Sequence, residues 1–320
     1  LLMQNTTLIL GLNPTWQRLF ITEDLVLGKI HRLPKPVEFA SGKGINCGRV
    51  LDLLGGKPIL LHFLGGANGR FIFDELAAAG LVQIPVWIQA NTRISTTLVS
   101  ETTTELIEPS PEISPEENAD FIKTLIENWD GVDRIVISGS FPLSFDTQAF
   151  FETNLKDKRI FIDAVTDIEE WLEKGVELLK INSNEYFTLL KQMEIPQVTS
   201  SPKFWEISAE ALLSKLPIRY LVVTDEENLV RAFFIEEEKL HFAQLKPPTV
   251  SVLNSIGAGD SFLAGWLRGD GLQLSFEEKL CKATAVAAAR CEVDRPWNIR
   301  LERVLELESK LQTQIEWFNN

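Results

Sequence analysis

The chain has 320 residues, of which 45% are hydrophobic and 24% are charged, a composition that excludes disorder as its dominant state. Its formal net charge of −14 argues against nucleic acid as a partner, because a phosphate backbone requires a basic protein surface. The apolar runs are no longer than a strand, so the sequence also predicts no membrane span and no membrane partner.

Segments typical of strands and segments typical of helices alternate along most of the chain. Strands are expected at 7–10, 59–64, 134–138, 159–163, 178–181 and 220–224. Helices are expected at 44–54, 71–79, 116–129, 147–155, 184–193, 208–215 and 261–267. This repetition predicts an α/β fold in which helices cover both faces of a mostly parallel sheet, a three-layer α/β/α sandwich.

Two stretches depart from this pattern, at about 17–39 and 86–108. Both are rich in Thr, Val, Ile and Phe and have little helical periodicity, so we expect extended strands inserted beside the main sheet. Ligands bind at the carboxyl edge of open α/β sheets, and a small β-sheet lid over that edge fits these segments. The expected organisation is therefore a single domain, 1–320, with two lid segments.

A glycine turn is the most informative part of the sequence. Gly257, Ala258 and Gly259 precede Asp260 at the start of an apolar helix. Small residues there let backbone N–H groups converge on an anion such as a transferring phosphoryl group, and Asp260 could accept the proton of an attacking hydroxyl. The alternative is a tight turn with Asp260 as a helix cap. The Walker pattern GxxxxGK[ST] is absent, which excludes a P-loop kinase.

Two further groups of residues have the chemistry of a phosphate site. Gly42 and Lys43 open a helix with Asn46 one turn later, so they could hold an anion, whereas the alternative is a flexible loop with a solvated lysine. Asn182 and Glu185 are three positions apart and would face the same way on a helical turn, which suits Mg²⁺ held through water. Their alternative role is a helix capping box.

The remaining basic and histidine residues are weaker candidates. Arg93 lies in a predicted lid strand, and its planar guanidinium suits phosphate, although exposed strand-edge arginines are common. Lys29 and Arg32 lie in the other lid segment. We expect a solvated face for the arginines near the C-terminus and a structural or surface role for the histidines: Arg290, Arg295 and Arg300, and His31, His62 and His241.

Taken in order, these motifs resemble the signatures of the ribokinase-like PfkB carbohydrate kinases over nearly the whole chain. The glycine turn resembles the C-terminal signature of that family. Four other elements are similar to its N-terminal GGKGxN signature, its SGSxP and KxNxxE elements and segments of its phosphosugar branch: Ser41–Asn46 with Gly48–Leu51, Ser138–Pro142, Lys180–Glu185, and Thr92–Arg93 with Thr104–Pro109. The phosphosugar branch comprises 1-phosphofructokinases and tagatose-6-phosphate kinases.

The resemblance implies a ribokinase-like fold and ATP-dependent phosphorylation of a sugar-phosphate hydroxyl, with ATP, Mg²⁺ and, as a further candidate, a monovalent cation such as K⁺. Asp260 would be the general base, and Gly257–Asp260 would form the anion hole. The implied substrate contacts are Gly42, Lys43, Asn46, Arg93, Gln17 and Ser140. The implied nucleotide contacts are Lys180, Asn182, Glu185, Thr224 and Ser255, with Asn182 and Glu185 near Mg²⁺ through water. A homodimer through the lid is also implied.

Two departures from the family pattern keep other interpretations open. Gln17 stands where the phosphosugar kinases have an aspartate that holds sugar hydroxyls. Asp225, Glu226 and Glu227 replace a glycine turn beside the nucleotide, and their charge would repel a triphosphate. The alternatives are a non-catalytic sugar-phosphate sensor that has lost ATP use, and a kinase of an unphosphorylated sugar or a nucleoside.

The cysteines and the N-terminus indicate the compartment. Cys47, Cys281 and Cys291 form no CxxC pair and no metal-ligand spacing, so we expect free thiols in a reducing environment. The sequence begins without a basic segment ahead of an apolar one, which predicts no secretory signal. The expected location is the cytoplasm.

Overall fold

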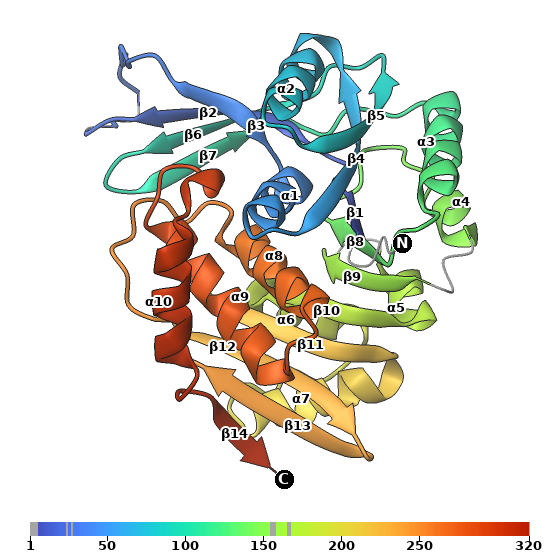
Figure 1. Ribbon diagram of the computed structural model, residues 1–320, viewed down its shortest axis with the longest axis vertical. Helices are drawn as coiled ribbons and strands as arrows, with labels where there is room; N and C mark the ends of the chain where they lie inside the picture. The colour runs from blue at the N-terminus through green and yellow to red at the C-terminus, as the bar shows by residue number, and fades with distance from the viewer. Residues whose placement is uncertain (1–5, 24, 27, 154–157, 165–167, 320) are drawn as a thin grey trace.

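The computed structural model describes residues 6–23, 25–26, 28–153, 158–164 and 168–319. Its larger sheet is built from β1 (Thr6–Leu10), β4 (Lys57–Gly65), β5 (Val82–Ile88), β8 (Arg134–Ser138), β9 (Arg159–Asp163), β10 (Val176–Asn182), β11 (Ile218–Asp225), β12 (Leu229–Glu236), β13 (Lys239–Leu245) and β14 (Glu316–Asn319). These ten strands lie in the order β14-β13-β12-β11-β10-β9-β8-β1-β4-β5 (Figure 1). From β11 to β5 neighbouring strands are parallel, while β12, β13 and β14 are antiparallel.

The parallel strands are buried on both faces, which explains their almost uninterrupted apolar sequences. In β1 all five residues are buried. Leu8 and Leu10 contribute to one hydrophobic core cluster, and Ile9 between them contributes to the other. Since side chains alternate along a strand, one short segment supplies both cores of a three-layer structure.

Helices cover each face. The face with Leu8 and Leu10 packs against α3 (Pro115–Asn128), α4 (Thr147–Glu152), α5 (Glu169–Lys174), α6 (Ser183–Gln192) and α7 (Phe204–Lys215). The opposite face packs against α1 (Lys43–Leu53), α2 (Gly66–Ala78), α8 (Ala258–Gly271), α9 (Phe276–Cys291) and α10 (Leu301–Leu311), and a 3₁₀ turn, Pro296–Asn298, precedes α10. In Figure 1, α1, α8, α9 and α10 lie together in front of the sheet. The predicted α/β/α class is therefore confirmed.

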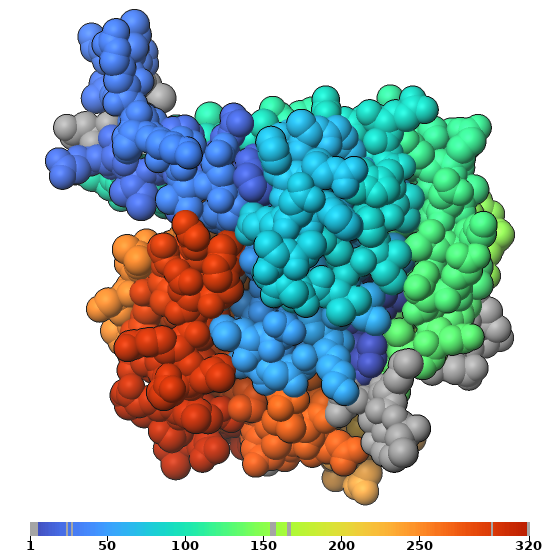
Figure 2. All heavy atoms as spheres, turned by 45° about the horizontal axis from the view of Figure 1, so that its top comes forward, coloured from blue at the N-terminus to red at the C-terminus, as the bar shows by residue number. Residues whose placement is uncertain are grey.

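A second, four-stranded sheet lies at one corner of the molecule (Figure 1). It consists of β2 (Thr15–Ile21), β3 (Val37–Ser41), β6 (Ile94–Val99) and β7 (Thr103–Ile107), in the order β3-β2-β6-β7. Two antiparallel hairpins, β2–β3 and β6–β7, are joined by the parallel pair β2–β6. The connection from β2 to β3 projects from the body (Figure 2). Residues 86–88, which the sequence placed in the second lid segment, belong instead to β5 of the large sheet.

Most predicted helices begin and end within a few residues of the observed ones. The helix expected at 71–79 begins earlier, at Gly66, and the one expected at 147–155 ends at Glu152, while 154–155 lie outside the described residues. Cys47, Cys281 and Cys291 are free thiols, as expected. Among the helices described, none combines the length and the apolar character needed to cross a bilayer.

Candidate active site

Most of the predicted site residues lie where the parallel strands end. Asn182 is the last residue of β10 and is in register with Thr224 near the end of β11. The start of α8, with the glycine turn, is close to the same edge, because the position of a methyl group added to Gly259 is only 2.7 Å from Lys180 Nζ of β10. The carboxyl edge of the sheet therefore brings together segments that are far apart in the sequence.

The glycine turn leaves several backbone donors unused. Gly257 is the N-terminal cap of α8 and has a φ of 78°, a left-handed conformation that favours glycine. The N–H of Ala258 donates to the carbonyl of Ser255 at 3.1 Å. In the part of the chain that the structure describes, the N–H groups of Gly257, Gly259 and Asp260 have no protein acceptor. Backbone N–H groups without a protein acceptor at a helix N-terminus are able to bind an anion.

Asp260 lies in the first turn of α8 and is only 6% exposed. Asn46 Nδ2 of α1 donates to Asp260 Oδ2 at 2.8 Å, and Ser41 Oγ donates to Asn46 Oδ1 at 3.3 Å. Burial and the carboxylate of Asp163 raise the pKa of Asp260 to about 6, although Lys43, Asn46 and Lys180 act in the opposite direction. The result is a buried carboxylate that changes its protonation state close to neutral pH.

Two lysines share one buried carboxylate that the motifs did not predict. Lys43 Nζ lies 3.0 Å from Asp163 Oδ1, and Lys180 Nζ lies 3.2 Å from Asp163 Oδ2. Lys43 Nζ also approaches Glu185 Oε1 at 3.4 Å. Burial alone would raise the pKa of Asp163, but Lys180 and Lys43 hold it below its usual range. Burial alone would lower the pKa of Lys43, yet Asp163, Glu185 and Asp260 together raise it. Asp163 therefore holds the ammonium groups of both lysines together at the edge of the sheet.

A small cavity of about 140 Å³ contains four of the predicted substrate contacts, Gly42, Lys43, Arg93 and Ser140. Asn13 stands between them: its Nδ2 donates to Ser140 Oγ at 3.1 Å, and its carbonyl accepts from Arg93 Nη2 at 3.0 Å. Nε of Arg93 is buried without an acceptor among the described residues. A guanidinium with an unsatisfied donor next to Lys43 makes this cavity suitable for an anionic group.

Gln17, Lys29 and Arg32 are not part of this cavity lining. Gln17 is 4% exposed and belongs to β2 of the lid, where its Nε2 donates to Thr97 Oγ1 of β6 at 2.8 Å. Lys29 and Arg32 are exposed on the projecting connection between β2 and β3. The structure thus gives Gln17 a partner within the lid and places the two cations on its outer rim.

Asn182 and Glu185 form the capping box of α6. The N–H of Glu185 donates to Asn182 Oδ1 at 2.9 Å, and the N–H of Asn182 donates to Glu185 Oε2 at 2.8 Å. No group of three or more Asp, Glu, His or Cys side chains among the described residues is arranged to hold a metal ion. The capping bonds leave lone pairs on the exposed Asn182 and on Glu185, so these residues fit Mg²⁺ through water rather than by direct coordination.

The other predicted nucleotide contacts lie on β10, on β11 and on the loop before α8. Thr224 lies near the end of β11, and its carbonyl accepts from Ser183 Oγ at 3.4 Å. It is followed by the acidic hairpin turn, in which Glu226 and Glu227 are exposed and Asp225 Oδ2 lies 3.5 Å from Arg231 Nη1. Ser255 is exposed on the loop before α8.

Arg290 is not on a solvated face, so that prediction was wrong. It lies in the last turn of α9 and is only 1% exposed. Its Nη1 donates to the carbonyl of Val293 at 2.7 Å and to the carbonyl of Asn254 at 3.4 Å. The apolar residues of α9 pack on α8, and this packing buries the arginine behind the glycine turn. Arg300 is exposed, as expected, and Arg295 is half-buried.

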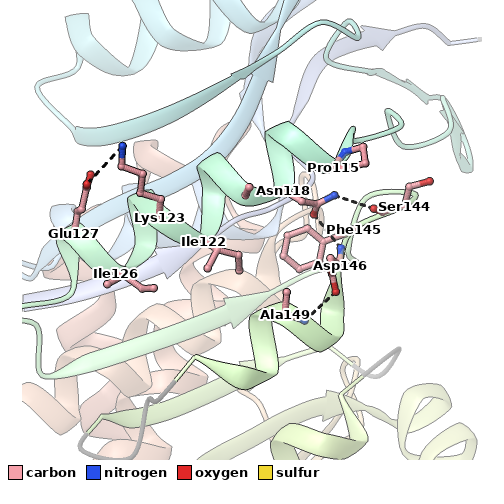
Figure 3. A pocket seen from close by; sticks show the side chains of 11 residues that line it. Pro115, Asn118, Ile122, Lys123, Ile126, Glu127, Ser144, Phe145, Asp146 and Ala149 are labelled. Atoms are coloured by element: carbon pink, nitrogen blue, oxygen red, sulfur yellow. Dashed lines mark hydrogen bonds and ion pairs between the residues drawn. The ribbon is translucent and has the colours of Figure 1, made fainter.

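The histidines have structural or surface positions. Burial lowers the pKa of His62 to about 4, and one of its ring nitrogens lies 3.2 Å from Gln83 Oε1. His31 and His241 lie in the lid connection and on β13, away from the glycine turn. A larger hollow of about 870 Å³ lies between α3 and α4 (Figure 3), where Lys123 pairs with Glu127 and Asn118 donates to the carbonyl of Ser144. None of the predicted site residues lines it.

Comparisons with known proteins agree with this arrangement. The model of the pfkB family carbohydrate kinases matches residues 17–296. A tagatose-6-phosphate kinase of Staphylococcus epidermidis is 27% identical over 319 residues, covering 95% of this chain and 98% of the relative.

Solved structures have the same fold. Phosphofructokinase-2 from Escherichia coli, in complex with substrates and products, superposes with a TM-score of 0.83 at 21% identity, covering 95% of this chain and 98% of the other. A possible 1-phosphofructokinase from Thermotoga maritima gives a TM-score of 0.79 at 20% identity, covering 98% and 99%. Other structures of the Escherichia coli enzyme show a potassium complex and a tetrameric inhibited form.

Proposed function

This chain belongs to the pfkB family of carbohydrate kinases, and from that membership and the geometry of the site we propose that it transfers the γ-phosphate of ATP to a hydroxyl of a sugar phosphate. The observation that carries the proposal is one turn of α8, in which the buried carboxylate of Asp260 adjoins three N–H groups that have no acceptor among the described residues. A base and an anion site within one turn are what phosphoryl transfer to a hydroxyl requires.

In the proposed reaction Asp260 accepts the proton of the substrate hydroxyl. Asn46 occupies Oδ2 of that carboxylate, which leaves Oδ1 for the hydroxyl. With a pKa of about 6, Asp260 is mostly ionised at neutral pH and ready to accept. The hydroxyl oxygen forms a bond to the γ-phosphorus, the bond from that phosphorus to the bridging oxygen breaks, and ADP leaves.

Two sets of donors stabilise the negative charge of the transferring phosphoryl group. The free N–H groups of Gly257, Gly259 and Asp260 point from the helix N-terminus, and Lys180 lies beside Gly259. These donors are in place before the reaction, so they stabilise developing charge without reorganisation. Mg²⁺, when bound with ATP, neutralises phosphate charge, and Asn182 and Glu185 would hold it through water. A monovalent cation such as K⁺ is a further candidate, as one complex of the Escherichia coli relative contains it.

We assign the substrate phosphate to the cavity lined by Lys43 and Arg93. Both cations border this cavity, and Arg93 keeps a buried donor without an acceptor among the described residues. Relatives named for tagatose 6-phosphate and fructose phosphates support a phosphorylated sugar. Gln17 carries no charge and donates within the lid, so the choice among sugar phosphates does not depend on a carboxylate at that position.

We also propose that the lid sheet forms a homodimer. Three large apolar side chains at its strands are exposed, namely Ile21, Leu106 and Ile107, each more than half accessible. Exposed apolar clusters of this kind typically mark contact surfaces. Light scattering on the purified protein measures the state directly, and a monomer at all concentrations would contradict the proposal.

A kinase screen tests the function. The substrates are fructose 1-phosphate, fructose 6-phosphate, tagatose 6-phosphate, ribose and adenosine, each with Mg-ATP. Turnover of one of the three phosphosugars above that of ribose and adenosine supports the proposal. Turnover of ribose or adenosine alone would instead identify a kinase of unphosphorylated substrates. If none reacts and calorimetry detects no Mg-ATP binding with or without sugar phosphate, the chain is a sensor.

A further inference from the structure

A buried arginine lies directly behind the proposed anion hole. Arg290, 1% exposed, donates through Nη1 to the carbonyl of Asn254, three residues before Gly257, and to the carbonyl of Val293. It therefore connects the loop that leads into the glycine turn with the segment that follows α9. The same two segments are also joined by backbone bonds, since the N–H groups of Leu253 and Asn254 both donate to the carbonyl of Cys291.

The guanidinium is close to the reacting groups without touching them. A methyl group placed on Gly257 would lie 3.8 Å from Arg290 Nε, 3.6 Å from Asp260 Oδ2 and 3.5 Å from Asn46 Nδ2. The Arg290 guanidinium and the Asn46–Asp260 pair therefore both border the space that a side chain at Gly257 would fill. Because Gly257 has no side chain, the guanidinium of Arg290 can lie this close to the Asn46–Asp260 pair.

The positive charge of Arg290 has no counter-ion among the described residues. Among the described residues no carboxylate lies within ion-pair distance of it, and its Nε has no acceptor. Burial lowers the pKa of Arg290 to about 10, and the opposing influence of Cys291, Asp260 and Asp294 does not cancel this effect. The side chain therefore remains a cation at neutral pH. A buried cation without a counter-ion is expensive in free energy, and carbonyl contacts alone would be met equally well by a neutral donor.

We propose that Arg290 is a positioning residue for phosphoryl transfer, which fixes the loop from Asn254 to Gly257 and supplies a permanent positive charge behind the anion hole. The inference rests on the proposed kinase function, because the anion that it serves is the transferring phosphoryl group. Its contribution is electrostatic and geometric: the free N–H groups point at one place, and Asp260 stays ionised beside a fixed cation.

The test uses Arg290→Met, which removes the charge, and Arg290→Lys, which keeps it. Arg303→Met is the matched control, because Arg303 pairs with Glu292 at the end of α9 and does not touch the glycine turn. We expect Arg290→Met to lower kcat by about tenfold or more while KM for the sugar phosphate changes by less than about threefold. Arg290→Lys should recover part of the lost kcat, and Arg303→Met should leave kcat within about twofold of the parent protein.

The pH profile separates an electrostatic role from a purely structural one. The charged groups near Asp260 are Lys43 on α1, Asp163 on β9, Lys180 on β10 and Arg290 on α9. Removal of one positive charge raises the pKa of the carboxylate, so the acidic limb of kcat should move to higher pH in Arg290→Met and stay in place in Arg290→Lys. An Arg290→Met protein with the parent kcat and the parent acidic limb would overturn the proposal, as would an equal loss in Arg303→Met.

Hydrogen exchange distinguishes failure of this inference from failure of the proposed function. If the parent protein phosphorylates none of the substrates, the kinase proposal fails, but the positioning role is still measurable. Amide exchange over 257–261 should be faster in Arg290→Met than in the parent or in Arg303→Met. Unchanged exchange there would overturn the positioning role whatever the activity.

Discussion

Asn46 Nδ2 lies 2.8 Å from Asp260 Oδ2, although 214 positions of sequence separate the two residues. The bond joins the first turn of α1 to the first turn of α8, and these helices pack side by side on one face of the sheet (Figure 1). Each helix begins after a glycine with positive φ, Gly42 or Gly257. The two glycine turns thus bring the Asn46 amide and the Asp260 carboxylate into contact, and substitutions at this site test their roles.

Replacement of Asp260 by Asn should lower turnover by about two orders of magnitude or more, because the base is lost while the shape is kept. Asn46 still finds an acceptor in the new side chain, so binding of Mg-ATP and sugar phosphate should change little. Steady-state kinetics with calorimetry measures both. Asp52→Asn, at an exposed position of α1, is the control. Near-normal turnover in the Asp260 variant would exclude this residue as the base.

Turnover should also fall as the pH is lowered through about 6. Burial and Asp163 raise the pKa of Asp260 to this value, so protonation removes the base below it. A profile of kcat from pH 5 to 9 tests this, with coupling enzymes checked separately at each pH. An acidic limb that stays near the ordinary carboxyl value of 3.8 would contradict the assignment.

The same carboxylate should reduce stability at neutral and alkaline pH. Its folded pKa of about 6 exceeds its ordinary value of 3.8, so its contribution is most favourable below about 4 and is lost as the pH rises through 6. Asp260→Asn should therefore increase the free energy of unfolding by roughly 1–3 kcal/mol at pH 8. Urea denaturation measures the gain, which should shrink toward pH 4. A gain that does not depend on pH would point to packing instead.

Arg93→Ala should raise KM for a sugar phosphate by about tenfold or more, since a charge-assisted contact to phosphate is lost. Turnover of an unphosphorylated sugar should not respond. Arg18→Ala, which removes an exposed ion pair with Glu38 in the lid sheet, provides the control. If KM for every phosphosugar is unaffected by Arg93→Ala, the phosphate does not bind in this cavity.

Neutralising the acidic turn after β11 should strengthen nucleotide binding. Glu226 and Glu227 are exposed beside Thr224 and the α6 capping box, where the triphosphate is proposed to lie. Glu226→Gln with Glu227→Gln should lower KM for Mg-ATP by about two- to tenfold, with a larger effect at low salt. The matched control neutralises Glu237 and Glu238, which form the next hairpin turn. An equal effect of both double variants would indicate a general charge effect.

Local patterns predicted the parts of the fold and site that depend on local structure. The parallel strands have continuous apolar runs because both of their faces are covered, and the helix starts at Lys43 and Ala258 follow glycines. In the structure these two helix starts bring Asn46 and Asp260 together. The spacing of Asn182 and Glu185 also predicted a capping box as their alternative role, and the structure contains that capping box.

Long-range packing determined what the sequence could not predict. Asp163 ends an apolar strand without any motif, and it becomes central only because Lys43 and Lys180 arrive from α1 and β10. Arg290 looks like a surface residue of a helix end until α9 packs against α8. The antiparallel strands β12, β13 and β14 were also missed; each of them pairs with a strand that neighbours it only in the folded sheet, β12 with β11, β13 with β12 and β14 with β13.

The position of Lys43 couples the binding of the two substrates. Its ammonium is held between Asp163 and Glu185 while its stem lines the cavity of Arg93 and Ser140. In the proposed function a sugar phosphate in this cavity competes with Asp163 and Glu185 for the Lys43 ammonium, and Mg-ATP acts through Glu185, so the two ligands act on the two partners of one ion pair. The affinities of the two substrates are therefore linked through one lysine, and linkage of this kind is reciprocal.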